Sequence, residues 1–248
     1  MTSVDHPIFT ESIRLIRELL AQRAVADLQL AAHLAGLSPL EREVLERCIH
    51  SSGDVAIAMD LRFSPAAAMD PADADRADGP DAAGGACALA LAALRAGAPI
   101  LTDTAMAAAA VTSMARRSLG TAVHNLLDWA PAVAPPGGTR SAAAVASAWE
   151  ALTAAGPAPL LLIGSAPTAL EALLDLVAAG APAPSLLIGM PVGFVGVAES
   201  KRRLQVSGLP QIRLEGSRGG AGLVAAAANA LLRRAAIERA ALDRAAAR

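Results

Sequence analysis

The sequence predicts a three-layer α/β/α fold, in which a largely parallel sheet of about five strands has helices on both faces. Two observations predict it. Short apolar runs alternate with longer helical patterns from Ala86 onward, and glycine with small polar residues gathers where the runs end. Alternation of this kind implies right-handed crossovers, which make neighbouring strands parallel and cover both faces with helices. We expect a single domain over 1–248, because this length can bury one sizeable core.

The N-terminal part predicts two helices. Apolar residues of the first fall near one face: Ile8, Ile13, Ile16, Leu19 and Leu20. The second begins at Ser38, where serine can cap, Pro39 suits the first helical position and Glu41 completes a capping box. It runs to about His50, and Gly53 marks its end. We expect His33 to lie in a loop between the two helices.

A low-complexity segment separates these helices from the rest of the chain. Met69 to Gly85 is rich in aspartate, alanine, glycine and proline, and such sequence cannot bury enough apolar surface to order itself. We interpret residues 69–85 as a flexible loop, since evenly scattered aspartates are usually solvated.

The remaining elements alternate. Strands are expected at Pro99–Thr102, Ala122–Leu127, Pro159–Ile163, Ser185–Ile188 and Gln211–Leu214. Helices are expected at Ala86–Ala96, Thr104–Met114, Ser141–Ala154, Thr168–Ala179, Ala198–Val206 and from Gly222 to near Arg248. Glycine-rich turns follow the last three strands, and ligands of such sheets bind beyond the carboxyl ends of the strands. We therefore expect a rim of backbone N–H groups there that suits carboxylates or phosphates, with glycines that let a ligand approach the backbone.

Composition argues against several classes of protein. The net charge is -2, from 21 basic and 23 acidic residues, and aromatic residues make up 2%, so a nucleic-acid surface is not expected. Apolar runs are interrupted before the roughly 20 residues that a membrane helix needs, and the N-terminus lacks a signal-peptide pattern. We expect a cytoplasmic protein without a membrane partner.

Cys48 and Cys87 have no metal-ligand spacing and are expected to be buried apolar residues.

The residues alone suggest one candidate for acid–base chemistry. His6 lies near the terminus and is expected to be solvated, whereas His124 lies in a predicted strand and is expected to pack. His50 ends a helix with Arg47 one turn earlier on the same face. From spacing alone a structural role for His50 is favoured. No Walker motif, dinucleotide fingerprint or Gly-x-Ser-x-Gly elbow is present. Motifs and periodicity alone therefore indicate an α/β binding enzyme and nothing more specific.

Several segments carry a more specific signal. They are Arg47-Cys48-Ile49-His50, Ala96–Leu101 leading into Asp103 and Met106, Thr139-Arg140-Ser141, Gly164–Leu170, and the 189–201 run Gly-Met-Pro-Val-Gly-Phe-Val-Gly-Val-Ala-Glu-Ser-Lys. Together, in this order and across nearly the whole chain, they resemble the precorrin-8X methylmutase family.

The resemblance implies an isomerase of cobalamin biosynthesis. It would move a methyl group from one ring carbon of precorrin-8X, or cobalt-precorrin-8, to its neighbour and give a hydrogenobyrinate-type or cobyrinate corrin. The resemblance implies no cofactor, no metal ligand and a homodimer. It assigns His50 as the residue that gives and takes back a proton, because protonating a ring nitrogen draws electron density from the macrocycle and eases the migration.

The resemblance also implies a set of substrate contacts. These are Ser12, Arg47, Thr112, Arg140, Ser165 and Thr168. The substrate carries many carboxylates, which suit guanidinium forks and hydroxyl donors. An ordinary alternative exists for some of these residues, since Arg47 and Arg140 could be solvated helix residues. Similarly, Glu199 and Lys201 could form a pair on a helix surface and carry no chemistry.

The chain departs from the family in places that leave other functions open. Ser165 stands where the family usually has Asn, Ser113 follows Thr112 where the family tends to have a basic residue, and the 69–85 segment is longer. A corrinoid carrier or sequestering protein that has lost turnover is the competing hypothesis. A structural or regulatory domain without a tetrapyrrole site is the third.

Overall fold

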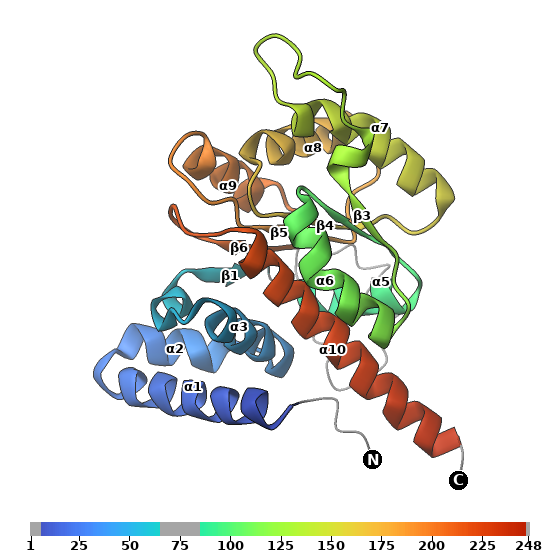
Figure 1. Cartoon of the computed structure of the whole chain (residues 1–248). Coiled ribbons are helices and arrows are strands. Elements are labelled where there is room, and N and C mark those ends of the chain that lie inside the picture. Colours follow the sequence, from blue (N-terminus) through green and yellow to red (C-terminus); the bar gives the residue numbers. More distant parts are fainter. Residues whose placement is uncertain (1–5, 65–84, 247–248) are drawn as a thin grey trace.

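A computed structural model describes residues 6–64 and 85–246 and confirms the predicted fold class (Figure 1). Its sheet has the strand order β1-β6-β5-β4-β2-β3. The strands are β1 (Leu61–Phe63), β2 (Ile100–Thr102), β3 (Val123–Asn125), β4 (Leu160–Ile163), β5 (Leu186–Gly189) and β6 (Gln211–Leu214). All neighbours are parallel except β1, which pairs antiparallel with β6 at one edge. The flexible loop predicted at 69–85 lies, except for Gly85, outside the described residues.

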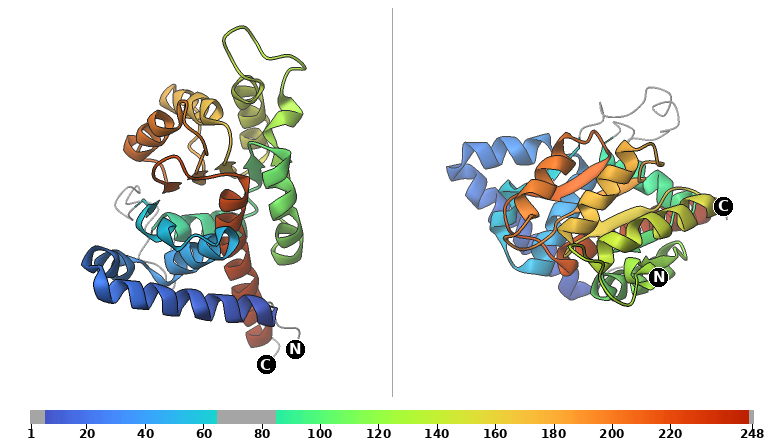
Figure 2. Two further views of the ribbon diagram at one scale, coloured as in Figure 1. Left: turned by 60° about the vertical axis from the view of Figure 1, so that its left-hand side comes forward. Right: turned by 90° about the horizontal axis from the view of Figure 1, so that it is seen from above.

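Helices form the two outer layers (Figures 1 and 2). They are α1 (Pro7–Ala26), α2 (Leu28–Gly36), α3 (Pro39–Ser52), α5 (Ala86–Arg95), α6 (Ala105–Ser118), α7 (Arg140–Ala155), α8 (Pro167–Ala178), α9 (Val197–Val206) and α10 (Ala221–Ala246). One face of the sheet is covered by α7, α8 and α9, and the other by α5, α6 and α10. The helix α3 belongs to this second layer and packs against α10 and α5, whereas α1 packs on the outer side of α3 and against α2.

The buried strand residues alternate between the two layers. Leu160 and Leu162 of β4 join the core beneath α10, whereas Leu161 and Ile163 join the core beneath α7 and α8. This alternation follows from the two-residue period of a strand, and both faces are apolar because helices cover both.

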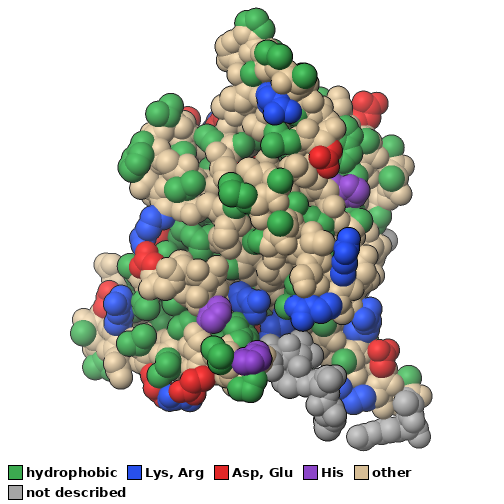
Figure 3. Space-filling model, viewed as in Figure 1, with side chains coloured by type: hydrophobic (Ala, Val, Ile, Leu, Met, Phe, Trp, Pro, Cys, Tyr) green, Lys and Arg blue, Asp and Glu red, His purple; other side chains and the backbone are tan. Residues whose placement is uncertain are grey.

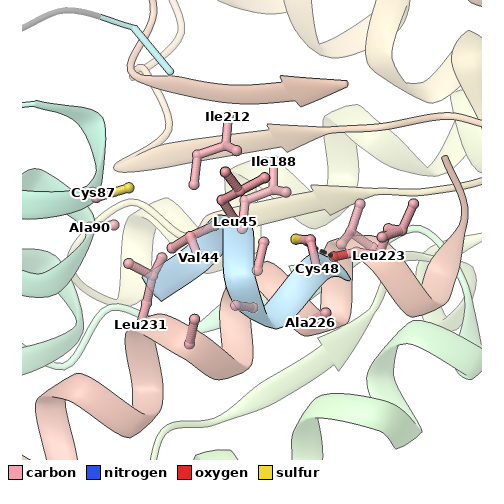
Figure 4. Packing of buried hydrophobic residues seen from close by; sticks show 14 of the residues in the cluster. Val44, Leu45, Cys48, Cys87, Ala90, Ile188, Ile212, Leu223, Ala226 and Leu231 are labelled. Carbon is pink, nitrogen blue, oxygen red and sulfur yellow. Dashed lines mark hydrogen bonds between the residues drawn. The ribbon is translucent and has the colours of Figure 1, made fainter. Parts of the chain in front are cut away.

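Packing against α10 fixes the position of α3, the helix that carries His50 (Figure 4). Leu45 and Cys48 of α3 lie between α10 and the sheet, near Leu223, Ile188 and Ile212. Burial of a leucine of this kind contributes about 2 kcal/mol. The end of α3 is therefore held rigidly to the core. Both cysteines are buried, as predicted.

The start and end of α3 are as predicted. The hydroxyl of Ser38 accepts a hydrogen bond from the N–H of Glu41, and the Glu41 carboxylate accepts one from the N–H of Ser38. Gly53 ends the helix with a φ of 69°, a conformation that favours glycine. No helix in the described part of the chain is long and apolar enough to cross a membrane.

Three local predictions need correction. His33 lies inside α2, not in a loop, because Asp27 accepts hydrogen bonds from the N–H groups of Gln29 and Leu30 and starts a new helix. The predicted strand Ala122–Leu127 is shorter, since the Asn125 side chain caps a 3-10 helix at Leu126–Trp129. The strand β1 was not predicted, because three residues are too few to show an alternating pattern.

Candidate active site

His50 lies in the last turn of α3 and forms a hydrogen bond with a side chain of α1. Its Nδ1 is 2.7 Å from the hydroxyl oxygen of Ser12 on α1. The capping box and Gly53 fix the length of α3, and the core packing of Leu45 and Cys48 fixes its rotation. Because Ser12 engages Nδ1, proton exchange between the imidazole and a ligand falls to Nε2. The His50 side chain is exposed, so a ligand can reach it.

An aromatic ring joins His50 to two arginines. The Phe9 ring meets the His50 ring edge to face, with centroids 5.1 Å apart. The guanidinium carbon of Arg47 lies 4.5 Å from the centroid of Phe9, and that of Arg233 on α10 lies 5.7 Å from it. We call Phe9, Ser12, Arg47, His50 and Arg233 the His50 cluster. Basic and histidine side chains gather on this face, where the α1 to α3 group meets α6 and α10 (Figure 3).

The surroundings of His50 favour its neutral form. Partial burial and then the positive charge of Arg47 lower the pKa of His50 below its ordinary value. The protonated ring donates from Nδ1 to Ser12 Oγ, and loss of its Nε2 proton leaves a neutral ring that keeps this hydrogen bond. The protonated ring, in turn, is a stronger acid than free imidazolium. Both properties suit a group that gives a proton and takes it back.

A second group of predicted contacts lies at the N-terminal ends of α7 and α8. The hydroxyl oxygens of Thr168 and Thr139 are 2.7 Å apart, and Thr139 caps α7. Arg140 donates from Nε to the carbonyl oxygen of Pro131. Ser165 lies two residues before the start of α8 and donates its backbone N–H to Asp103.

The structure thus brings some predicted residues together and places others apart. Hydrogen bonds and ring contacts join Ser12, Arg47 and His50, whereas Thr139 and Thr168 are joined elsewhere. Thr112 lies on α6, where its hydroxyl donates to the carbonyl oxygen of Ala108 one turn earlier.

The N–H rim predicted after β4 is occupied by a carboxylate of the protein itself. Asp103 follows β2 and is 1% exposed. Its Oδ2 accepts hydrogen bonds from the N–H groups of Gly164, Ser165 and Ala166 at 2.9, 2.6 and 2.9 Å. Burial raises the pKa of Asp103 even though these hydrogen bonds favour its charged form. The prediction that this part of the rim meets a ligand anion is therefore wrong, and Asp103 instead fixes the loop that carries Ser165.

Two of the glycines thought to admit a ligand serve internal packing. A Cβ atom at Gly219 would lie 2.0 Å from the carbonyl oxygen of Met190, and one at Gly164 would lie 2.7 Å from the N atom of Ala221. These glycines let the turns after β4, β5 and β6 pack directly on one another.

The alternative that paired Glu199 with Lys201 on a helix surface is also wrong. Lys201 is 2% exposed, and its Nζ donates to the carbonyl oxygens of Gly216 and Arg218, each at 2.7 Å. Burial lowers the pKa of Lys201 to about 8. Glu199 instead forms an ion pair with Arg202. Lys201 therefore ties α9 to the turn after β6, a role that the sequence motif did not reveal.

Comparison with known proteins agrees with these features. The family described as "Precorrin-8X methylmutase" matches residues 7–234. A cobalt-precorrin-8 methylmutase of Synechocystis is 34% identical over 232 residues, which cover 94% of this chain and 97% of the relative. A precorrin-8X methylmutase of Pseudomonas aeruginosa is 38% identical over 214 residues, or 85% and 92% of the two chains.

A solved structure has the same fold. The precorrin-8X methylmutase of Thermus thermophilus superposes with a TM-score of 0.71 at 34% identity, covering 94% of this chain and 99% of that one. The family match over residues 7–234 spans the sheet, both helical layers and the helix that carries His50. The chain belongs to the precorrin-8X methylmutase family.

Proposed function

We propose that this chain moves a methyl group between neighbouring ring carbons of precorrin-8X or cobalt-precorrin-8, with His50 as the acid–base residue. As a member of the family, the chain is an isomerase of cobalamin biosynthesis. The observation that carries the role of His50 is its 2.7 Å hydrogen bond to Ser12 beside Arg47. An exposed imidazole whose Nδ1 is held by a neighbour presents Nε2 to a ligand in one orientation.

The proposed step begins with transfer of a proton from Nε2 of the His50 imidazolium to a nitrogen of the macrocycle, which leaves a neutral imidazole whose Nδ1–H donates to Ser12 Oγ. The protonated ring is poorer in electrons, so the methyl group migrates with its bonding pair to the adjacent carbon. The proton then returns to His50. Atoms and electrons balance without an oxidant or reductant, because the product is an isomer of the substrate. Proton transfer by a positioned side chain accelerates such steps by roughly 10²–10⁴-fold.

We propose that the remaining family positions hold the substrate. Arg47 and Arg140 would bind carboxylates, while the hydroxyls of Ser12, Thr112, Ser165 and Thr168 would donate or accept hydrogen bonds. Arg140 follows β3 in the chain and Ser165 and Thr168 follow β4, whereas the His50 cluster lies on α1, α3 and α10. A wide macrocycle is the kind of ligand that can reach more than one of these elements.

We also propose that the chain works as a single-domain homodimer in the cytoplasm. One continuous sheet supports both cores, which favours a single domain. Phe194 and Val195 are 92% and 88% exposed, and apolar side chains of this size are suited to burial against a second subunit. Sedimentation equilibrium tests the dimer, and a monomer at micromolar concentration would contradict it.

Conversion of precorrin-8X by the purified protein tests the proposed activity. We expect the absorbance spectrum to change to that of the corrin product in a single phase. Unchanged substrate in the presence of active-site binding would contradict the activity. The carrier hypothesis has one observation in its favour, the short Ser165 side chain where the family usually has Asn. Tight binding of the corrin product without conversion of substrate would support that hypothesis.

A further inference from the structure

Arg218 binds the segment that follows α3, the helix of His50. Its guanidinium donates from Nη1 to a carboxylate oxygen of Asp54 at 2.6 Å and from Nη2 to the carboxylate of Asp60. These two aspartates flank η1 (Val55–Met59), the 3-10 helix between α3 and β1. Arg218 lies 164 positions beyond Asp54, in the turn between β6 and α10. One side chain from this turn therefore holds both ends of η1.

Asp54 connects this contact to the last turn of α3. Its backbone N–H donates to the hydroxyl of Ser52 at 3.2 Å, and that hydroxyl donates to the carbonyl oxygen of Cys48 at 2.9 Å. His50 lies between Cys48 and Ser52, and its side chain is exposed whereas Cys48 is buried. The hydrogen bond from Arg218 also lowers the pKa of Asp54, so this carboxylate stays charged. The turn that carries the imidazole is thus bonded onward to Arg218.

The turn that carries Arg218 is itself held in place. The carbonyl oxygen of Arg218 accepts a hydrogen bond from Nζ of Lys201, which is 2% exposed. The N–H of Gly220 donates to the carbonyl oxygen of Met190 at 2.9 Å, and a Cβ atom at Gly219 would lie 2.0 Å from the same oxygen. Backbone packed this closely cannot shift unless the neighbouring turn moves with it. Arg218 therefore ties the end of α3 to the edge of the sheet.

We infer that Arg218 is a positioning residue, which fixes the last turn of α3 so that His50 keeps its orientation toward the ligand. The inference rests on the proposed function for the role of His50. A planar guanidinium that binds two carboxylates defines their positions more strictly than a single surface ion pair does. A small displacement of an acid–base group slows the chemical step, because the proton must cross a longer or poorly aligned path. Arg218 should therefore affect turnover more than affinity.

The kinetic test uses Arg218→Gln and a matched arginine elsewhere. We expect kcat to fall by about fivefold, with KM and the affinity for the corrin product hydrogenobyrinate within about twofold of native protein. Arg218→Lys keeps a charge that can bind one aspartate and should recover part of the loss. Arg203 also binds two carboxylates, Glu171 and Asp175, and its side chain is 38% exposed against 40% for Arg218. Arg203→Gln should keep the native kcat.

Asp54→Ser tests the same contact from its other side. Serine can still cap η1 but is too short to reach Arg218, so this variant should lose kcat as Arg218→Gln does. Thermal denaturation shows whether each variant is folded. Two variants that act through one imidazole are not independent, so adding Arg218→Gln to Ser12→Ala should leave kcat near that of Ser12→Ala. Multiplication of the two losses would assign Arg218 a role apart from His50 and would overturn the inference.

A measurement without substrate separates this inference from the proposed activity. The ¹⁵N chemical shift of His50 Nδ1 reports its hydrogen bond to Ser12, and the signal is identified by its loss in His50→Ala. In Arg218→Gln we expect this shift to move toward its value in Ser12→Ala, whereas Arg203→Gln should keep the native value. A native shift together with a native kcat in folded Arg218→Gln or Asp54→Ser would overturn the inference. A moved shift in a native protein that lacks turnover would instead count against the activity alone.

Discussion

Ser12 on α1 and His50 on α3 are joined by a 2.7 Å contact between Oγ and Nδ1, although 38 positions separate them in the sequence. The contact links the N-terminal helix to the proposed catalytic residue. It also occupies Nδ1 in either tautomer, so Nε2 is the ring nitrogen left to exchange a proton with a ligand.

Loss of the Ser12 hydroxyl should slow turnover and leave the fold intact. In Ser12→Ala the imidazole loses the partner that holds its orientation, and we expect kcat to fall by about tenfold, the equivalent of one hydrogen bond. Ser12→Thr keeps a hydroxyl and is the matched control. Steady-state kinetics with precorrin-8X provides the measurement, and an unchanged kcat in Ser12→Ala would show that the contact does not support catalysis.

Removal of the Arg47 charge should raise the pKa of His50. Burial lowers this pKa first and Arg47 lowers it further, so Arg47→Gln removes only the second contribution. The imidazole then stays protonated to a higher pH, and any limb of the pH–rate profile that reports the titration of His50 should move to higher pH. NMR titration of the imidazole protons measures the shift, with the His50 signal identified by its loss in His50→Ala. Arg47→Lys keeps the charge, and a pKa in Arg47→Gln at or below that of native protein would contradict the prediction.

Replacement of Asp103 should loosen the loop that carries Ser165. Asp103→Ala leaves three N–H groups without their acceptor, and loss of such buried hydrogen bonds costs about 1–3 kcal/mol of unfolding free energy. Asp103→Asn keeps one oxygen acceptor and should lose less. Urea denaturation compares the variants. If Asp103→Ala were as stable as native protein, the carboxylate would not be fixing the loop.

The contribution of Lys201 to stability should depend on pH. The pKa of Lys201 is about 8 in the folded chain and 10.5 in a solvated lysine, so the unfolded chain binds more protons between these values. Stability from this group therefore rises with pH across that window. Lys201→Met should lose about 1–3 kcal/mol of unfolding free energy because two carbonyl oxygens lose their donor. The difference in unfolding free energy between native protein and this variant should grow from pH 8 to 10.5. A deficit that shrinks with rising pH would contradict this account.

The regular elements were largely predictable from the sequence because their signals are local. The capping box at Ser38, the glycine at position 53 and the apolar runs of β4 and β5 depend on nearby residues alone. The Asp27 cap that begins α2 is also a local signal, and it accounts for the helical position of His33.

The contacts that build the site were not predictable from local pattern. Asp103 binds N–H groups 61 to 63 positions away, and Lys201 reaches carbonyl oxygens 15 and 17 positions away. Whether a charged residue is solvated or buried depends on which turns the sheet brings beside it. Family resemblance supplied His50, Arg47 and Ser12 as candidates, but the contacts of His50 and Arg47 with α1 come only from tertiary packing.

The most direct test of the central claim compares binding and turnover in His50→Ala. Removal of the imidazole should leave the affinity for hydrogenobyrinate within a few fold, because arginines and hydroxyls hold the ligand. Turnover of precorrin-8X should fall by at least about 10²-fold, the smallest contribution expected of a positioned acid–base residue. A folded His50→Ala protein that binds the corrin and converts precorrin-8X at the native rate would contradict the account.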